Sequence, residues 1–473
     1  MDATIDTGKH RQGWLRRVGQ ALAKLLDDEK AGGKKNTISV LDGVRGIAVL
    51  LVVSFHVNLV SGNKLWDWQT NPLASSVTTA GGTGVTLFFV LSGFLLFMPF
   101  AKALLFKSSW PLVRVYYLRR MFRIFPGYYI SLFLLILVAY QQYLDANHRL
   151  NMLLFLTFFM DSSRLTFRTL DGPFWTLATE WQYYMILPLM CVAMAFAVRW
   201  VPVAKRLRAI MLCLLGVITC GLAVRLWGLN YSANPGQSFL WFPPVVVNVL
   251  VFIFFGITGK YTEDFAIGML ISLLYIYAQH PSTRVAFTKR WQQLSPWLWR
   301  AGIIILVFSA MWHFKSSQPA AWPFLNGVMS YFNWLSDMVL AIGFGLCIAA
   351  ILYGRESLKR PFAWKPLRRV GLISYSLYIW HLPLLGVLVA EVLPVFHLTN
   401  VYVIYLLYWL WVLLVIFPFS LLFFTCIEKP FMHMGDRLRK AIERKHFERS
   451  KMREQAARTA PNARGSEGAV LHR

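Results

Sequence analysis

The sequence predicts an all-α, polytopic membrane protein with about ten transmembrane helices and one further apolar segment that re-enters the membrane or lies at its outer face. Of its residues, 57% are hydrophobic and 15% are charged, and the mean hydropathy is +0.50. Globular proteins carry roughly 25% charged residues, and a soluble fold could not bury this much apolar surface. Lysine and arginine outnumber aspartate and glutamate by 48 to 22. We attribute this excess to cytoplasmic loops, which collect basic residues, and expect no nucleic-acid partner.

Each membrane-spanning helix requires about 20 predominantly apolar residues. Ten stretches provide approximately this length, of which the seventh is short: 38–60, 85–105, 124–144, 173–198, 209–229, 264–280, 301–315, 330–353, 370–394 and 401–426. An eleventh apolar stretch, 243–258, begins with Pro243-Pro244 and contains Asn248, so its path is uncertain from hydropathy alone.

The basic residues decide the path of 243–258. Forty of the 48 lie before the first stretch, after the last one, or in 102–123, 199–208, 284–300 and 355–369. All forty fall on one side only if 243–258 does not cross, and the side rich in lysine and arginine is the cytoplasmic one. We therefore predict ten spans with both termini in the cytoplasm. The 243–258 segment is then re-entrant or at the outer face, where protein or a water-filled cavity must cover it.

The membrane domain comprises residues 37–431, and the regions on either side of it are basic. Residues 1–36 form either a short amphipathic helix on an anionic leaflet or a solvated tail. Residues 432–473 form a cytoplasmic tail, in which 437–464 extends the last helix before the chain becomes disordered. The five cysteines lie in apolar stretches and form no CxxC pair, so we predict no metal site.

The first predicted span carries two ionisable residues, Arg45 and His56. Their spacing of eleven residues is close to three helical turns, so they share one helix face about 16 Å apart along the axis. Ionisable groups inside a bilayer are costly, which makes each a candidate functional residue. The structural alternative is that Arg45 extends to the interface and His56 bonds a neighbouring carbonyl.

The entrance to the third span contains Arg119, Arg120 and Arg123. Arg120 and Arg123 are one helical turn apart and could share an anion. A planar guanidinium binds phosphate through two hydrogen bonds, so this pair suits a phosphorylated ligand. Ordinary positive-inside topology explains the same arginines equally well.

The fourth span contains Glu180, five residues after Trp175. A lone carboxylate in an apolar helix would become protonated, so Glu180 requires a partner, and His56 or an arginine is the natural one. A Glu–His pair would orient the imidazole as a base. The alternative is a structural hydrogen bond between helices.

Two further helices carry polar or small residues. Ser92-Gly93 in the second span favours close helix packing. Tyr378 and His381 share one face of the ninth span and indicate either a second polar site or an interfacial aromatic belt with a satisfied histidine. Of these two, we favour the aromatic belt for His381.

Taken in chain order from about Ile38 to Phe431, the motifs of these spans resemble those of the acyltransferase-3 family of integral-membrane O-acyltransferases. The matching motifs are Leu-Asp-Gly-x-Arg-Gly with Arg-x10-His (Arg45, His56), Phe-Phe-x-Leu-Ser-Gly-Phe, Arg-x-x-Arg (Arg120, Arg123), Trp-x-Leu-x-x-Glu (Trp175 to Glu180), Ser-Tyr-x-x-Tyr-x-x-His and Glu428-Lys429-Pro430-Phe431. Family members often have Glu-Glu where this chain has Glu180-Trp181. A role that needs two adjacent carboxylates therefore does not transfer to this chain.

The resemblance implies a ten-helix core and an O-acyltransferase of the cytoplasmic (inner) membrane. Its co-substrate is cytoplasmic acyl-CoA, often acetyl-CoA, and no tightly bound cofactor is expected. The acceptor is a hydroxyl of a glycan, a lipid-linked saccharide or a small metabolite, so the expected partners are this acceptor, acyl-CoA and membrane lipids. The rival classes are a transporter or flippase for a lipid-linked glycan, which should show internal repeats that we do not find, and a pseudoenzyme that only binds.

The candidate residues divide into three groups. The catalytic group has His56 as the base, Glu180 as the residue that orients it, and Arg45 as the guide for the donor. The acyl-CoA-binding group is Arg119, Arg120 and Arg123. The substrate-binding group is Trp175, Tyr378 and His381.

Overall fold

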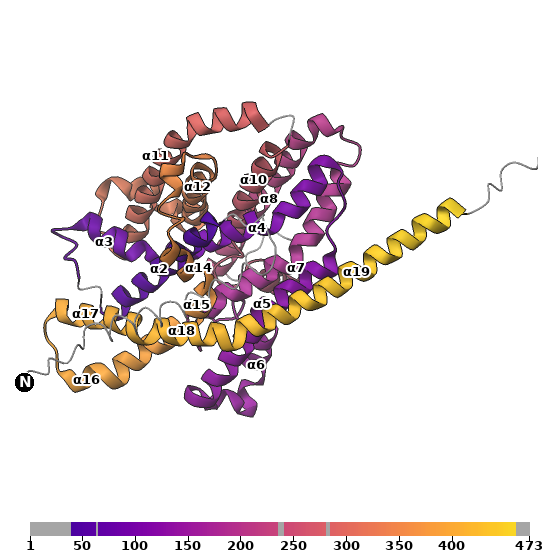
Figure 1. Ribbon diagram of the computed structural model, residues 1–473. Coiled ribbons are helices and arrows are strands. Elements are labelled where there is room, and N and C mark those ends of the chain that lie inside the picture. Colours follow the sequence, from indigo (N-terminus) through magenta and orange to yellow (C-terminus); the bar gives the residue numbers. More distant parts are fainter. Residues whose placement is uncertain (1–38, 63–64, 235–240, 281–283, 460–473) are drawn as a thin grey trace, which may run out of the picture.

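The structure, a computed structural model, describes residues 39–459 apart from 63–64, 235–240 and 281–283. The predicted amphipathic segment 1–36 and the end of the tail, 460–473, lie outside these residues. Every regular element in the described part is helical, as the sequence predicts. The helices form one bundle, and the last helix runs out of it as a straight extension (Figure 1).

The α-helices have the bounds α2 Val40–Val60, α3 Pro72–Thr79, α4 Gly84–Phe106, α5 Val113–Ala139, α6 Arg149–Leu156, α7 Phe174–Ala197, α8 Val203–Ala233, α9 Pro244–Phe254, α10 Thr262–Ala278, α11 Arg284–Ser317, α12 Phe332–Tyr353, α13 Glu356–Lys359, α14 Lys365–Leu372, α15 Ser374–Val387, α16 Leu393–Phe396, α17 Val401–Trp411, α18 Phe417–Phe423 and α19 Lys429–Thr459. Short 3-10 segments are η2 Ala80–Thr83, η3 Gln141–Leu144, η4 Ala146–His148 and η5 Pro323–Tyr331, and π-helical segments are η6 Leu388–Val392, η7 Val412–Ile416 and η8 Phe424–Glu428.

Eight helical stretches of the described chain are long and apolar enough to cross a membrane: Val40–Val60, Pro72–Phe106, Val113–Ala139, Val203–Ala233, Lys289–Ser317, Pro323–Tyr353, Ser374–Phe396 and Val401–Arg449. The other two predicted spans are α7 and α10, helices of 24 and 17 residues. Two predicted boundaries are wrong, because α5 begins at Val113 rather than at 124 and α11 extends over Arg284–Ser317 rather than 301–315. Hydropathy detects only the apolar part of a helix, and both helices continue into charged sequence beyond it.

Helix α9, within the difficult stretch 243–258, has 11 residues. At 1.5 Å per residue it is about 16 Å long, which is too short to cross a hydrocarbon core of about 30 Å. One of its faces packs on α8, where Val247 contacts Trp227 and Tyr231. The remaining residues of α9 are mostly exposed, as expected for a segment at the membrane surface.

The direction of α10 gives a second reason why α9 does not cross. Helices α4 and α10 run parallel, because Phe89 contacts Phe265 (4.8 Å between ring centroids) near their starts and Phe106 contacts His280 (4.4 Å) at their ends. Helices α5, α7 and α8 lie between them in the chain. With three crossings between them, α10 points the same way as α4, whereas a fourth crossing by α9 would reverse it. The arrangement agrees with the predicted ten spans.

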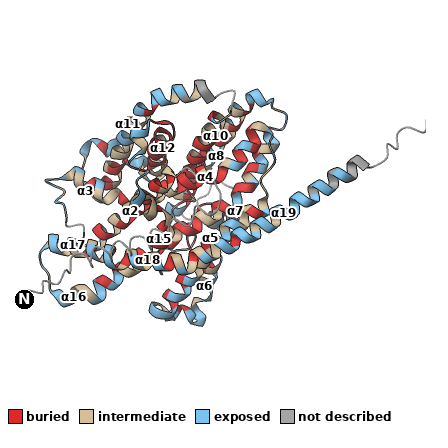
Figure 2. Ribbon diagram, viewed as in Figure 1, coloured by how far each residue is buried: buried red, intermediate tan, exposed pale blue. Residues whose placement is uncertain are grey.

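The buried residues concentrate where α2, α4, α10, α12 and α15 meet, whereas α6, α16, α17 and α19 are largely exposed (Figure 2). A buried network of ion pairs connects helices in part of this interior. Arg225 of α8 lies 3.3 Å from Glu263 of α10 and 2.8 Å from Asp337 of α12. Sequence reasoning did not single out this network, which joins three helices and therefore holds the wall of the bundle in place.

Candidate active site

Two histidines from helices far apart in the sequence form the centre of the site. His56 lies on α2 and His381 on α15, and His381 Nε2 is 3.1 Å from His56 Nδ1. The two ring centroids are 4.8 Å apart. His381 is 0% exposed, whereas His56 is only partly buried. A reactant could therefore reach His56 and not His381.

The hydrogen bonds of the pair determine which nitrogen is free. His381 Nδ1 lies 2.8 Å from Tyr378 O and 3.2 Å from Leu377 O. A carbonyl oxygen only accepts, so this nitrogen carries the hydrogen and Nε2 of the neutral ring is an acceptor. His56 Nδ1 lies 2.9 Å from Val52 O, so it donates to that carbonyl and to His381. The lone pair of His56 is then on Nε2. The hydrogen bond to a neighbouring carbonyl, expected as the structural alternative, is therefore present, and it leaves Nε2 free to act as a base.

Tyr378 lies beside this pair, whereas Trp175 packs against other residues. The Tyr378 ring is 5.9 Å from that of His381, and its hydroxyl is 2.5 Å from Thr176 Oγ1. Trp175 contacts the ring of Tyr261 at 5.6 Å. Asp171, just before α7, is buried, and its carboxyl oxygens have no hydrogen-bond partner in the described chain. Burial raises the pKa of this carboxyl well above its usual range, so we expect it to be protonated at neutral pH.

Glu180 does not make its predicted contact with His56. Its Oε1 accepts hydrogen bonds from the hydroxyls of Ser92 on α4 and Tyr184 on α7. Tyr184 is one turn further along the same helix, and the contact with Ser92 joins α7 to α4. His381 therefore occupies the orienting position beside His56 that the sequence analysis gave to Glu180. The sequence favoured an interfacial aromatic belt for His381, but the structure buries this histidine and places it in contact with His56.

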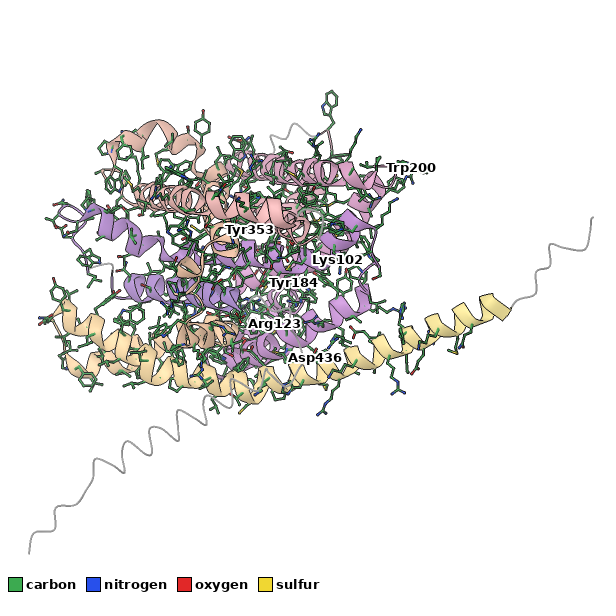
Figure 3. All side chains as sticks on the ribbon, turned by 45° about the horizontal axis from the view of Figure 1, so that its top comes forward. Lys102, Arg123, Tyr184, Trp200, Tyr353 and Asp436 are labelled. Carbon is green, nitrogen blue, oxygen red and sulfur yellow. The ribbon has the colours of Figure 1, made fainter. Side chains whose placement is uncertain are left out.

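Three arginines gather at the other end of this polar interior. Arg45 of α2 interacts electrostatically with Arg120 and Arg123 of α5. The Arg120 guanidinium lies 5.8 Å from the ring centroid of Tyr184, and Arg123 Nη1 lies 3.8 Å from Met432 Sδ. Within the described residues, none of the three forms an ion pair with a carboxylate. Figure 3 labels Arg123 and Tyr184.

Arg119 lies at the edge of this group. It is exposed, and it interacts electrostatically with Arg120 and with Asp436 and Glu443 of α19, the long helix on which Figure 3 labels Asp436. Arg119 and Arg123 are four positions apart on one helix face, so the predicted role of Arg119 in binding acyl-CoA beside Arg120 and Arg123 stays a prediction.

Sequence reasoning missed Arg168, which lies in the segment 157–173 between α6 and α7. Its guanidinium lies 5.5 Å from the ring centroid of Trp175, and it interacts electrostatically with His56. One signal could have found it. By the charge count, Arg168 is one of about six basic residues on the side that positive-inside topology keeps nearly free of them, so topology does not explain its charge.

Helix α2 connects the group of three arginines to the histidine base. Arg45 and His56 are eleven residues apart on α2, about 16 Å along the axis. A long anionic ligand could place its charge at the arginines and its reacting end at His56.

Comparison with known proteins gives a consistent family assignment. The family model described as "Acyltransferase domain" matches residues 38–425. The peptidoglycan O-acetyltransferase OatA of Listeria monocytogenes is 26% identical over 361 residues, which cover 73% of this chain and 49% of the relative. The putative peptidoglycan O-acetyltransferase YrhL of Bacillus subtilis is 22% identical over 363 residues, covering 73% and 48%. This chain thus spans about half the length of the curated relatives that it matches, and no solved structure matches it.

Proposed function

The chain belongs to this acyltransferase family, and we propose that it is an O-acyltransferase of the cytoplasmic membrane that moves an acetyl group from cytoplasmic acetyl-CoA to a hydroxyl of a glycan or lipid-linked saccharide. The observation that supports this most directly is His56, whose free Nε2 lies on the same helix as Arg45 and within reach of a reactant. The names of the relatives favour a glycan of the peptidoglycan type as the acceptor.

The donor half of the proposal rests on charge. The phosphates of CoA would neutralise Arg45, Arg120 and Arg123, with which no carboxylate of the described chain forms an ion pair. Arginine suits this task because its guanidinium binds phosphate through paired hydrogen bonds. The pantetheine arm would then run along α2 and place the thioester beside His56.

The transfer step requires only the two substrates and residues of this chain. His56 Nε2 takes the proton of the acceptor hydroxyl as its oxygen attacks the thioester carbonyl carbon. The C–S bond breaks, and the CoA thiolate takes the proton from the imidazolium. His381 Nε2 accepts the hydrogen bond from His56 Nδ1 throughout, so it holds the ring in place and stabilises its charged form. A covalent acyl-enzyme that carries the group across remains a variant of this scheme.

The alternative function is transport of a lipid-linked glycan without chemistry. Buried arginines would serve a transporter equally well, but a transporter has no need of an imidazole whose free nitrogen is set by two neighbours. That difference favours the acyltransferase.

Release of CoA from acetyl-CoA by the purified full chain in nanodiscs tests the function. We expect release that increases when a muropeptide acceptor is added, with acetyl ester appearing on the acceptor by mass spectrometry. The transporter interpretation predicts no release of CoA with any acceptor, together with movement of a fluorescent lipid-linked glycan across a vesicle membrane.

Arg120→Ala and Arg123→Ala are each expected to raise the KM for acetyl-CoA by about 10-fold or more, with a smaller change in kcat at saturation. Each variant loses a charge-assisted phosphate contact, worth about 1.5–3 kcal/mol. Lysine at either position should restore only part of the affinity, because an ammonium is a point charge. The matched control is Arg114→Ala, an exposed arginine on the same helix. Donor kinetics like those of the wild type in both alanine variants would contradict the proposed donor site.

Reporter fusions after Arg290 and at the C-terminus are both expected to report a cytoplasmic position. Fusions within 145–170 and 316–328 should report the opposite side. The reason is that the cytoplasmic donor site requires Arg120 and Arg123 on that side, and α9 adds no crossing before Arg290. Opposite readings at both Arg290 and the C-terminus would mean eleven crossings, and His381 would then approach His56 from the wrong direction.

A further inference from the structure

Arg168 is held in an unusual conformation beside the histidine pair. Its φ of +60° lies in the left-handed region, which is uncommon for residues other than glycine. Its guanidinium lies 5.0 Å from the ring centroid of Phe167 and 5.5 Å from that of Trp175. Such strain persists where the surrounding structure enforces it, and it is concentrated at functional sites. The side chain is therefore directed by two aromatic rings and a strained backbone.

In the described chain, Arg168 forms no ion pair with a carboxylate. Two other basic residues assigned to the same side, Lys260 and Lys315, have partners. Lys260 Nζ lies 2.6 Å from Asp161 Oδ2, and Lys315 Nζ donates to Pro319 O and Ala321 O at 2.9 Å. Arg168 is exposed and interacts electrostatically with both His56 and Tyr378.

This unpaired charge has a consequence for the proposed reaction. His56 becomes positively charged when it takes the acceptor proton, and a second positive charge nearby opposes that step. An anion bound at Arg168 would remove the opposition. The reaction is therefore favoured when the acceptor itself brings a negative charge to the position between Arg168 and His56.

We propose that Arg168 binds a carboxylate of the acceptor saccharide, so that the enzyme selects sugars with an anionic group near the hydroxyl that it acylates. This inference rests on the proposed function and specifies its acceptor. The partly buried rings of Phe167 and Trp175 lie beside each other, with centroids 5.7 Å apart, and offer a surface on which a sugar ring can stack. Arg168 is thus a specificity-determining residue at the end of the site opposite the donor arginines.

The test compares two acceptors that differ in one group. The probes are a disaccharide of N-acetylglucosamine and N-acetylmuramic acid with a free lactyl carboxylate, and the same disaccharide with that carboxylate converted to an amide. The full chain is assayed in a non-ionic detergent without phospholipid. We expect the wild type to have a KM about 10- to 100-fold lower for the carboxylate, as expected for a charge-assisted contact.

Arg168→Gln should raise the KM for the carboxylate to that for the amide and leave the KM for acetyl-CoA unchanged. Arg168→Lys should keep part of the discrimination, which also shows that the variant chain folds. The matched control is Arg164→Gln, an exposed arginine of the same segment, which should behave as the wild type.

Equal KM values of the wild type for the two probes, or an equal effect of Arg168→Gln on both, would overturn the proposal. An effect of Arg168→Gln that appears only when anionic phospholipid is present would also overturn it, because the residue would then bind a lipid phosphate. These outcomes are distinct from failure of the proposed function, in which the wild type releases no CoA with either probe.

Discussion

His56→Ala is expected to lower the rate of acyl transfer by about 10²- to 10⁴-fold, the usual cost of losing a general base. Nε2 of His56 is the nitrogen of the histidine pair that carries a free lone pair and can be reached, because His381 is 0% exposed and uses both of its nitrogens for hydrogen bonds. Affinity for acetyl-CoA should change little, because Arg45, the donor arginine on the same helix, lies about 16 Å away along α2, and Arg120 and Arg123 lie on α5. The measurement is acetyl transfer to a muropeptide at saturating donor, beside a binding isotherm for CoA.

The matched control is His397→Ala, an exposed histidine in the connection between α16 and α17. It should retain the activity of the wild type. Transfer by His56→Ala within a few-fold of the wild type would falsify the assignment of His56 as the base, and a loss of CoA binding would indicate damage to the bundle.

The architecture of the bundle could be predicted because each span depends on local composition. Twenty apolar residues define a helix in the bilayer, and the charge between spans defines its direction. These two rules gave the ten spans and excluded a crossing at 243–258, where α9 has 11 residues. They placed the start of α5 at 124 instead of Val113, because the rules do not register a helix that continues into arginine-rich sequence.

The site could be predicted only where one helix contains it. Arg45 and His56 were identified because their spacing alone puts them on one face of α2. The contact between His56 and His381 joins residues 325 positions apart, and only the packing of α15 against α2 creates it. The same is true of Glu180, whose partner Ser92 is 88 positions away. Arg168 depends on a left-handed backbone conformation that no residue pattern in the sequence indicates.

The packing that brings His381 to His56 begins at Gly371, and replacing this glycine is expected to have an effect almost as large as removing the base. A methyl group added at Gly371 would sit 1.8 Å from Asp42 O, a backbone atom of α2 that cannot rotate away. Helix α14 would have to move from α2 by more than 1 Å. Since α15 follows α14 after one residue, this displacement would reach His381.

Gly371→Ala should therefore lower acyl transfer by about 10²-fold, the effect that a misplacement of about 1 Å can have on a catalytic site. It should also lower the unfolding midpoint in detergent, since overpacking typically costs about 1–3 kcal/mol. Gly386→Ala is the matched control, because it adds the same methyl group in α15 with nothing within 4 Å. Should Gly371→Ala transfer acetyl as fast as Gly386→Ala, the crossing of α14 and α2 would not determine the position of His381, and another contact of α15 would have to hold the histidine pair together.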